Sequence, residues 1–92
     1  MIKKKRVRLE VIYDILRIIR NNQNSIKPTP LLRYSNLSSQ RFTEYFNELI
    51  EKEFIKEVID EEGRKFITLT DKGFKYLDKY KSIKTFIEDF DL

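Results

Sequence analysis

Apolar residues recur at helical spacing in the first quarter of the chain. One stripe predicts a helix from about Val7 to Asn22, and its members are Leu9, Ile12, Ile15, Leu16 and Ile19. A second apolar set, Val7, Val11 and Ile18, lies on the opposite side of the same helix. Two interpretations of this second set remain open: a partly exposed face of β-branched residues, or a surface for a partner.

Two further helices are predicted in the middle of the chain, separated by a short polar hinge. Thr29 is suited to cap a helix over residues 30–35, whose proline at the first position needs no N–H partner. Ser38 is suited to cap a longer helix over residues 39–52. The apolar positions of that helix are Phe42, Tyr45, Phe46 and Leu49. The hinge Asn36-Leu37-Ser38 places Leu37 where it can fill the angle between the two helices.

The last third of the chain begins with two predicted strands, over residues 54–59 and 65–69. Gly63 can adopt a positive φ in the turn between them. Thr70 can cap a final helix that runs to about residue 90. The sequence therefore predicts an α+β fold, a winged helix-turn-helix of order α-α-α-β-β-α with an extended C-terminal helix.

The composition narrows the chemistry. The chain has 92 residues, which suits one domain, and it has neither Cys nor His. Disulfides, thiolate metal sites and Ser-His or Cys-His nucleophiles are therefore excluded, and no Gly-rich phosphate loop is present. We expect no enzyme, no cofactor, no metal and no small-molecule ligand. No run of 18 apolar residues occurs, so we expect no membrane span and a cytoplasmic, nucleoid-associated protein.

The formal net charge is +4, but it is unevenly distributed. Residues 1–10 hold five basic side chains against Glu10, whereas residues 41–62 hold eight acidic side chains against three basic ones. A polyanion is therefore expected to meet the first forty residues before the middle of the chain.

A series of short motifs carries a family resemblance. They are "TPLLRYSNLS" at residues 29–38, the pair Tyr45 and Leu49, Phe54-Ile55, and "LTDKG" at residues 69–73. Over residues 7–80 the chain resembles the small archaeal winged-helix family that includes the ten-kilodalton DNA-binding proteins of thermophilic crenarchaea and many predicted transcriptional regulators. The resemblance implies a winged-helix fold, DNA binding without catalysis, and dimerisation through a long last helix. Glu53 departs from the family's usual Gly, and the wing is acidic at Asp60-Glu61-Glu62.

The candidate DNA-reading surface is the amino half of the helix over residues 39–52. Ser and Thr can bond phosphates or base edges, and Gln or Asn can pair bidentately with adenine in a major groove. The candidates there are Ser38, Ser39, Gln40, Arg41, Thr43 and Asn47. Three carboxylates of the same helix count against this use, because they repel phosphates: Glu44, Glu48 and Glu51. Glu48 and Glu51 lie in the carboxyl half, which usually leaves the groove, so only Glu44 is a direct objection.

Phosphate contacts are expected from three groups of cations. They are a flexible amino-terminal arm with Lys3, Lys4, Lys5, Arg6 and Arg8, the pair Lys27 and Arg33 around the short helix, and Arg64 and Lys65 in the wing. If about six of them neutralise phosphates, log affinity should fall with log salt at a slope near −5. The alternative for the arm is a disordered solubilising tail.

The final helix carries two patterns. Phe74 and Leu77 are suited to the domain core, whereas a heptad seam is formed by Tyr76, Tyr80, Ile83, Ile87 and Phe90. Together with the second stripe, Val7, Val11 and Ile18, this seam predicts a homodimer. The alternative is that Ser82 breaks the helix and the tail folds back. The expected organisation is a basic arm over 1–8, a winged-helix domain over 9–80 and a dimerisation extension over 81–92.

The sequence thus predicts a homodimeric, archaeal DNA-binding protein that acts in transcription regulation. The helix over residues 39–52 would enter the major groove of double-stranded DNA, with arm and wing on phosphates. The alternative is a winged-helix protein–protein interaction module that uses the acidic surface of that helix and the wing.

Overall fold

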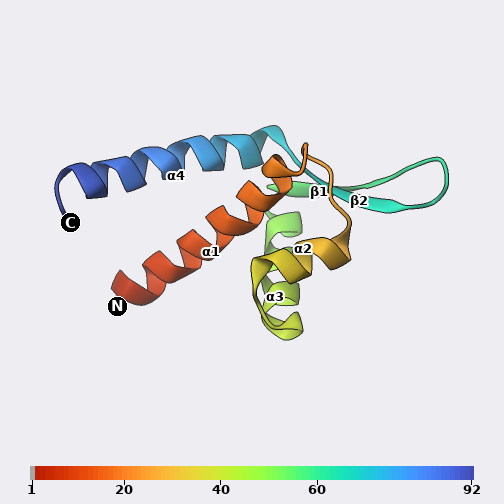
Figure 1. The fold of residues 1–92 in the computed structure, drawn as a ribbon, viewed down its shortest axis with the longest axis horizontal. Helices are drawn as coiled ribbons and strands as arrows, with labels where there is room; N and C mark the ends of the chain where they lie inside the picture. Colours follow the sequence, from red (N-terminus) through yellow and green to blue (C-terminus); the bar gives the residue numbers. More distant parts are fainter. Residues whose placement is uncertain (1) are drawn as a thin grey trace.

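The computed structural model describes the backbone of residues 2–92 and the side chains of residues 8–92. Its elements are α1 (Ile2–Asn21), α2 (Pro28–Ser35), α3 (Ser39–Glu51), β1 (Ile55–Ile59), β2 (Lys65–Leu69) and α4 (Asp71–Asp89). The α+β winged helix-turn-helix order is confirmed. In Figure 1 the hairpin of β1 and β2 extends from one side of the body and α4 from the other, giving extents of 50 × 26 × 21 Å.

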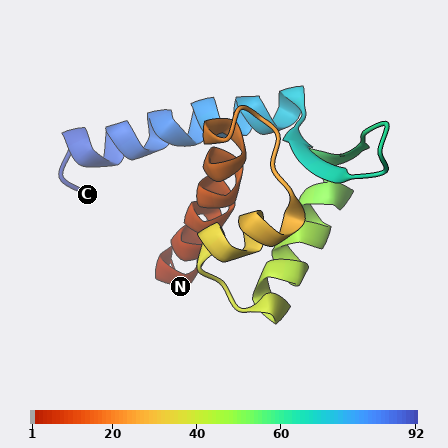
Figure 2. The ribbon, with the colours of Figure 1, turned by 45° about the vertical axis from the view of Figure 1, so that its right-hand side comes forward.

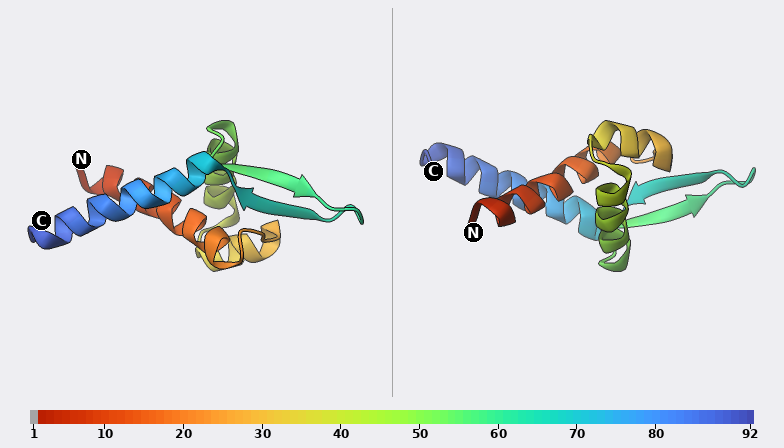
Figure 3. Two further views of the ribbon diagram at one scale, coloured as in Figure 1. Left: turned by 90° about the horizontal axis from the view of Figure 1, so that it is seen from above. Right: turned by 90° about the horizontal axis from the view of Figure 1, so that it is seen from below.

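The core forms around α1, which contacts α2, α4 and β2. The first stripe predicted for this helix is its buried face: Ile12, Ile15, Leu16 and Ile19 are buried, and Leu9 is half-buried. Leu31 of α2, Leu49 of α3 and Ile67 of β2 are fully buried with them. Figures 2 and 3 show α1 crossing α4 on one side and meeting α2 and α3 on the other. Val11 and Ile18 are half-buried against the same core, so both contact their own domain.

Two helix boundaries differ from the prediction. The first helix begins at Ile2 instead of about Val7, so the backbone of the expected arm is helical from that residue on. Lys and Arg are good helix formers, and no Gly or Pro separates them from the apolar stripe. The short second helix begins at Pro28, with Lys27 as a cap that lacks a side-chain bond, so Thr29 lies inside it. A proline is tolerated there because first-turn N–H groups have no partner within the helix.

The predicted caps of α3 and α4 have the expected geometry. The Ser38 hydroxyl oxygen accepts from the Arg41 N–H at 3.2 Å, and Asn36 in the hinge is left-handed with φ 63°. The Thr70 hydroxyl oxygen accepts from the Gly73 N–H at 3.2 Å. These bonds fix where each helix begins, and therefore where the amino end of α3 points.

The last helix does not break at Ser82. It continues to Asp89, because the Ser82 hydroxyl donates to the Asp78 carbonyl oxygen at 3.2 Å instead of interrupting the backbone ladder. Along the described helices, no stretch combines the length and apolar character that crossing a bilayer requires.

Candidate nucleic-acid interface

The amino half of α3 presents a polar surface to solvent. All six residues proposed from the sequence are exposed there: Ser38, Ser39, Gln40, Arg41, Thr43 and Asn47. The Thr43 hydroxyl donates to the Ser39 carbonyl oxygen at 2.9 Å and keeps its acceptor lone pairs available. Within residues 8–92, the side chains of Ser39, Gln40 and Asn47 have no hydrogen-bond partner. The helix buries its opposite side through Phe42 and Leu49, so these polar groups face outward for a packing reason.

Three cations, one before α2, one in α2 and one in α3, are not engaged by carboxylates of residues 8–92. Arg41 lies over the ring of Tyr45, Arg33 over Tyr34, and Lys27 over Phe66, with 5.9–6.0 Å between charge and ring centroid. Such contacts hold the side chain without cancelling its charge. They leave these three cations available to phosphates.

The two cations expected to contact phosphates from the wing form ion pairs within the hairpin. The Arg64 guanidinium pairs with Asp60 at 2.8 Å and with Glu62 at 2.6 Å, both in its own turn. Lys65 pairs with Glu57 at 3.6 Å. The Arg64 backbone N–H, aided by its side chain, holds the pKa of Asp60 below its usual value, so the turn keeps this negative charge. Both wing cations are therefore partnered by acids. Sequence analysis did not pair them, because it assigned Glu57 and Lys65 to two strands and Asp60, Glu62 and Arg64 to the turn between them.

Arg8 is also engaged within the chain. Its guanidinium pairs with Glu48 of α3, and the same carboxylate accepts from Lys52 at 3.2 Å. Arg8 and Arg41 line a shallow hollow of about 260 Å³ between α1 and α3, together with Glu44, Tyr45 and Glu48. Within residues 8–92, only Arg8 and Glu48 form an ion pair there, while Arg41 and Glu44 line the same hollow without one. The side chains of Lys3, Lys4, Lys5 and Arg6 lie outside the described residues.

A family model described as winged helix-turn-helix matches residues 5–88. The chain belongs to the winged helix-turn-helix family. This confirms the resemblance read from the sequence motifs. No curated protein sequence matches this winged helix.

Two solved structures are similar to this winged helix. One is Sso10a-2, a DNA-binding protein from Sulfolobus solfataricus, with a TM-score of 0.70 and 18% identity, covering 89% of this chain and 82% of that one. The other is a transcriptional regulator of the MarR family from Silicibacter pomeroyi, with a TM-score of 0.65 and 14% identity, covering 84% of this chain and 54% of that one. At these identities the likeness establishes the fold.

The expected dimer seam of this winged helix divides into two parts. Tyr76 is half-buried and donates from its hydroxyl to the Leu9 carbonyl oxygen at 2.8 Å, and burial raises its pKa to about 12. Tyr80 is buried, with its ring centroid 4.8 Å from that of Tyr13. Within one copy these two residues thus pack on the chain's own α1, and their expected place in a partner surface stays a prediction. Of the expected apolar set on α1, Val7 has its side chain outside the described residues.

The far part of the seam is exposed. Ile83 is 51% and Phe90 64% exposed, and Ile87 is half-buried. The sequence reasoning missed Phe86, whose ring lies 4.9 Å from that of Phe90 and is equally open. Considering all apolar residues of the last ten positions, instead of only those that fit a heptad, would have included Phe86.

Proposed function

We propose that the chain is a DNA-binding regulator or chromatin-type protein that inserts the amino half of α3 into a major groove. The observation that carries this is the exposed set of side-chain donors and acceptors at residues 38–47, which no other part of residues 8–92 engages. Gln40 and Asn47 suit the bidentate pattern that an adenine edge offers. Ser38 and Ser39 stand at a helix amino terminus, where backbone N–H groups favour an approaching phosphate.

Phosphate contacts come from the helical side of the domain instead of the wing. Lys27, Arg33 and Arg41 supply unpaired cations, and the first turns of α1 add Lys3, Lys4, Lys5 and Arg6. With about six of these in use, the slope of log affinity against log salt is near −5. We expect this protein to bind DNA in the nucleoid.

We further propose that two copies associate through the exposed end of α4. Ile83, Phe86 and Phe90 stand beyond the part of α4 that packs on α1, and Leu92 follows them. An apolar helix end of this kind is expected to be covered by another copy. A two-fold dimer would place its two α3 helices on half-sites one or more helical turns apart.

Gel-shift titration on random and genomic duplexes at low and moderate salt tests the DNA proposal. The Gln40→Ala and Asn47→Ala variants should lose sequence preference, by about 1–3 kcal/mol at a contacted base, while keeping the salt slope. Lys79→Ala, which changes an exposed residue of α4 outside residues 38–47, is the control. Absence of salt-sensitive binding at micromolar protein would overturn the proposal.

The dimer is tested by removing residues 82–92 and measuring mass in solution. The shortened chain keeps Leu77 and Tyr80 and hence the packing of α4 on α1. The intact chain should be a dimer, with twice the mass of one intact copy, and the shortened chain should be a monomer. The same number of copies in both would rule out the end of α4 as the interface.

A further inference from the structure

The hairpin has one closed edge and one open edge. On the β2 side, Ile67 exchanges backbone bonds with Ile26 at 3.2 and 2.7 Å, and the Leu69 N–H donates to the Asn24 side-chain oxygen at 2.7 Å. On the β1 side, no group of the described chain forms hydrogen bonds with the outward-facing backbone of the strand. The hairpin is therefore a two-stranded sheet to which a strand can be added only at β1.

The ladder fixes which backbone groups face this open edge. The Thr70 N–H donates to the Phe54 carbonyl oxygen at 3.1 Å, and the Asp60 N–H to the Arg64 carbonyl oxygen at 2.9 Å. In an antiparallel pair, alternate residues turn their N–H and C=O groups towards the partner strand. Even-numbered residues of β1 therefore face β2, and the backbone groups of residues 55, 57 and 59 point outward.

A groove of about 800 Å³ lies at the root of this edge, between the end of α3, β1 and the start of α4. Its apolar lining comes from Ile50, Ile55 and Leu69. Further along the hairpin, Ile59 is 57% exposed and Val58 is 40% exposed. The edge thus offers main-chain bonds and, beside them, apolar surface for alternate side chains of an added strand.

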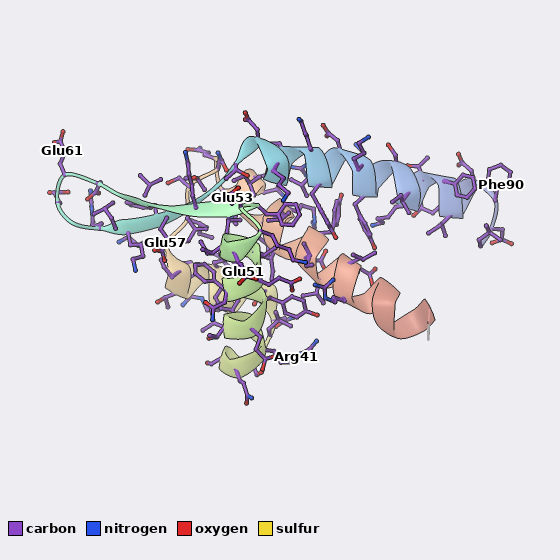
Figure 4. All side chains as sticks on the ribbon, turned by 180° about the vertical axis from the view of Figure 1, so that it is seen from behind. Arg41, Glu51, Glu53, Glu57, Glu61 and Phe90 are labelled. Carbon is purple, nitrogen blue, oxygen red and sulfur yellow. The ribbon has the colours of Figure 1, made fainter. Side chains whose placement is uncertain are left out.

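Carboxylates follow the same edge. Figure 4 shows Glu51, Glu53, Glu57 and Glu61 in succession from α3 to the tip of the hairpin, and we call these four residues the acidic edge. Glu51, Glu53 and Glu61 form no ion pair within residues 8–92, whereas Glu57 pairs with Lys65 at 3.6 Å. Three of the four carboxylates therefore have no ion-pair partner within residues 8–92, although Lys56 and Lys72 also line the groove.

Glu53 adds an independent observation. It rims the groove and holds a left-handed backbone with φ 63°, where its Cβ crowds the following carbonyl. Glycine would make the same corner without that strain. The same left-handed backbone occurs at Gln23, Asn24, Asn36 and Asp91, and at Glu53 it places a carboxylate at the rim of the groove.

We propose that the open edge of β1 binds an extended, basic segment of another protein as a third strand. Backbone groups of residues 55, 57 and 59 would pair with the segment, and its Lys or Arg side chains would lie against the acidic edge. A second copy of this hairpin is disfavoured, because it would bring Glu57 and Asp60 against like charges. The site lies at the carboxyl end of α3 and on the wing, away from the polar amino half of α3, so one molecule can hold DNA and this segment together.

The probe is a fluorescein-labelled peptide of seven residues that alternates lysine and valine, titrated with the full chain by fluorescence anisotropy. Saturable binding is expected, and the same peptide with glutamate in place of lysine should not bind. A version N-methylated at its central amides keeps charge but cannot donate, and should bind roughly tenfold or more weakly. Equal binding of the N-methylated peptide, or no binding of the parent peptide, overturns the proposal.

Protein variants separate the edge from general charge attraction. Glu53→Gln and Glu57→Gln should each weaken peptide binding roughly two- to fivefold. Glu44→Gln is the matched control, since Glu44 is an exposed, unpaired carboxylate of α3 outside the groove. Duplex affinity should not fall in any of the three. An effect of Glu44→Gln on peptide binding as large as that of Glu53→Gln would overturn the proposal.

Discussion

Replacing Glu48 by glutamine should strengthen DNA binding. Glu48 pairs with Arg8 at the flank of α3, and a carboxylate competes with phosphates for that guanidinium. Glutamine keeps the size of the side chain and removes its charge. Arg8 would then be available to a phosphate without first leaving a partner.

The structure bounds the size of the effect. The Arg8 and Glu48 side chains are 44% and 23% exposed, so their pair is a surface ion pair that contributes about 0.2–1 kcal/mol. If the unmodified protein breaks the pair on binding, Glu48→Gln should raise affinity by about 1.4- to 5-fold. If the unmodified protein does not use Arg8, the variant gains one phosphate contact through Arg8. At about 0.1 M salt this contact raises the affinity by about eightfold and steepens the slope of log affinity against log salt by about 0.9.

The assay is fluorescence anisotropy on a duplex of about 30 base pairs, long enough for two half-sites one turn apart, at several salt concentrations. A double-mutant cycle with Arg8→Ala isolates the pair, because the gain from Glu48→Gln should largely disappear in that background. Lys52→Ala is the matched control for the second partner of Glu48. A gain that persists undiminished in the Arg8→Ala background refutes the reasoning.

Three further predictions concern the framework around the interface. Gly73→Ala should lower the free energy of unfolding by about 1–3 kcal/mol in urea denaturation, since a Cβ there would clash with the Phe54 carbonyl oxygen; an unchanged midpoint would contradict the close approach. The pKa of the Asp60 carboxyl, followed by NMR, should lie below 3.8, and Arg64→Ala should raise that pKa only in part because the backbone N–H remains. The ionised Asp60 stabilises the turn above pH 3.8, and this stabilisation is lost as the pH falls through the lower pKa of the folded state. Because the pKa of Tyr76 is raised to about 12, stability should fall as pH rises from about 10 to 12, and Tyr76→Phe should remove that part of the alkaline loss.

Local rules predicted most of the elements. The stripe of α1, the caps at Ser38 and Thr70, and the turn at Gly63 each depend on residues within a few positions of one another. Gly63 adopts φ 81° and both hydroxyls cap as expected, because propensity and capping act over one turn of chain. The exposed polar face of α3 followed in the same way from the apolar positions opposite it.

The charges around the interface could not be assigned from local rules. Arg8 meets Glu48 across forty positions of sequence, and Lys65 meets Glu57 only because the hairpin register brings their strands together. The basic residues of the expected arm suggested a solvated, flexible segment. Lys and Arg are also good helix formers, and the segment forms the start of α1. Which cations are available to a phosphate is therefore a property of packing.

The order of helices and strands, the hinge before Ser38 and the outward face of α3 follow from neighbouring residues, because periodicity and caps act locally. Long-range packing, in contrast, sets which charges cancel, which of the tyrosines of α4 enter the core, and which edge of the hairpin stays open. Each of these depends on how far apart in space distant residues come to lie, and electrostatic pairing and hydrogen bonding act over only a few ångströms.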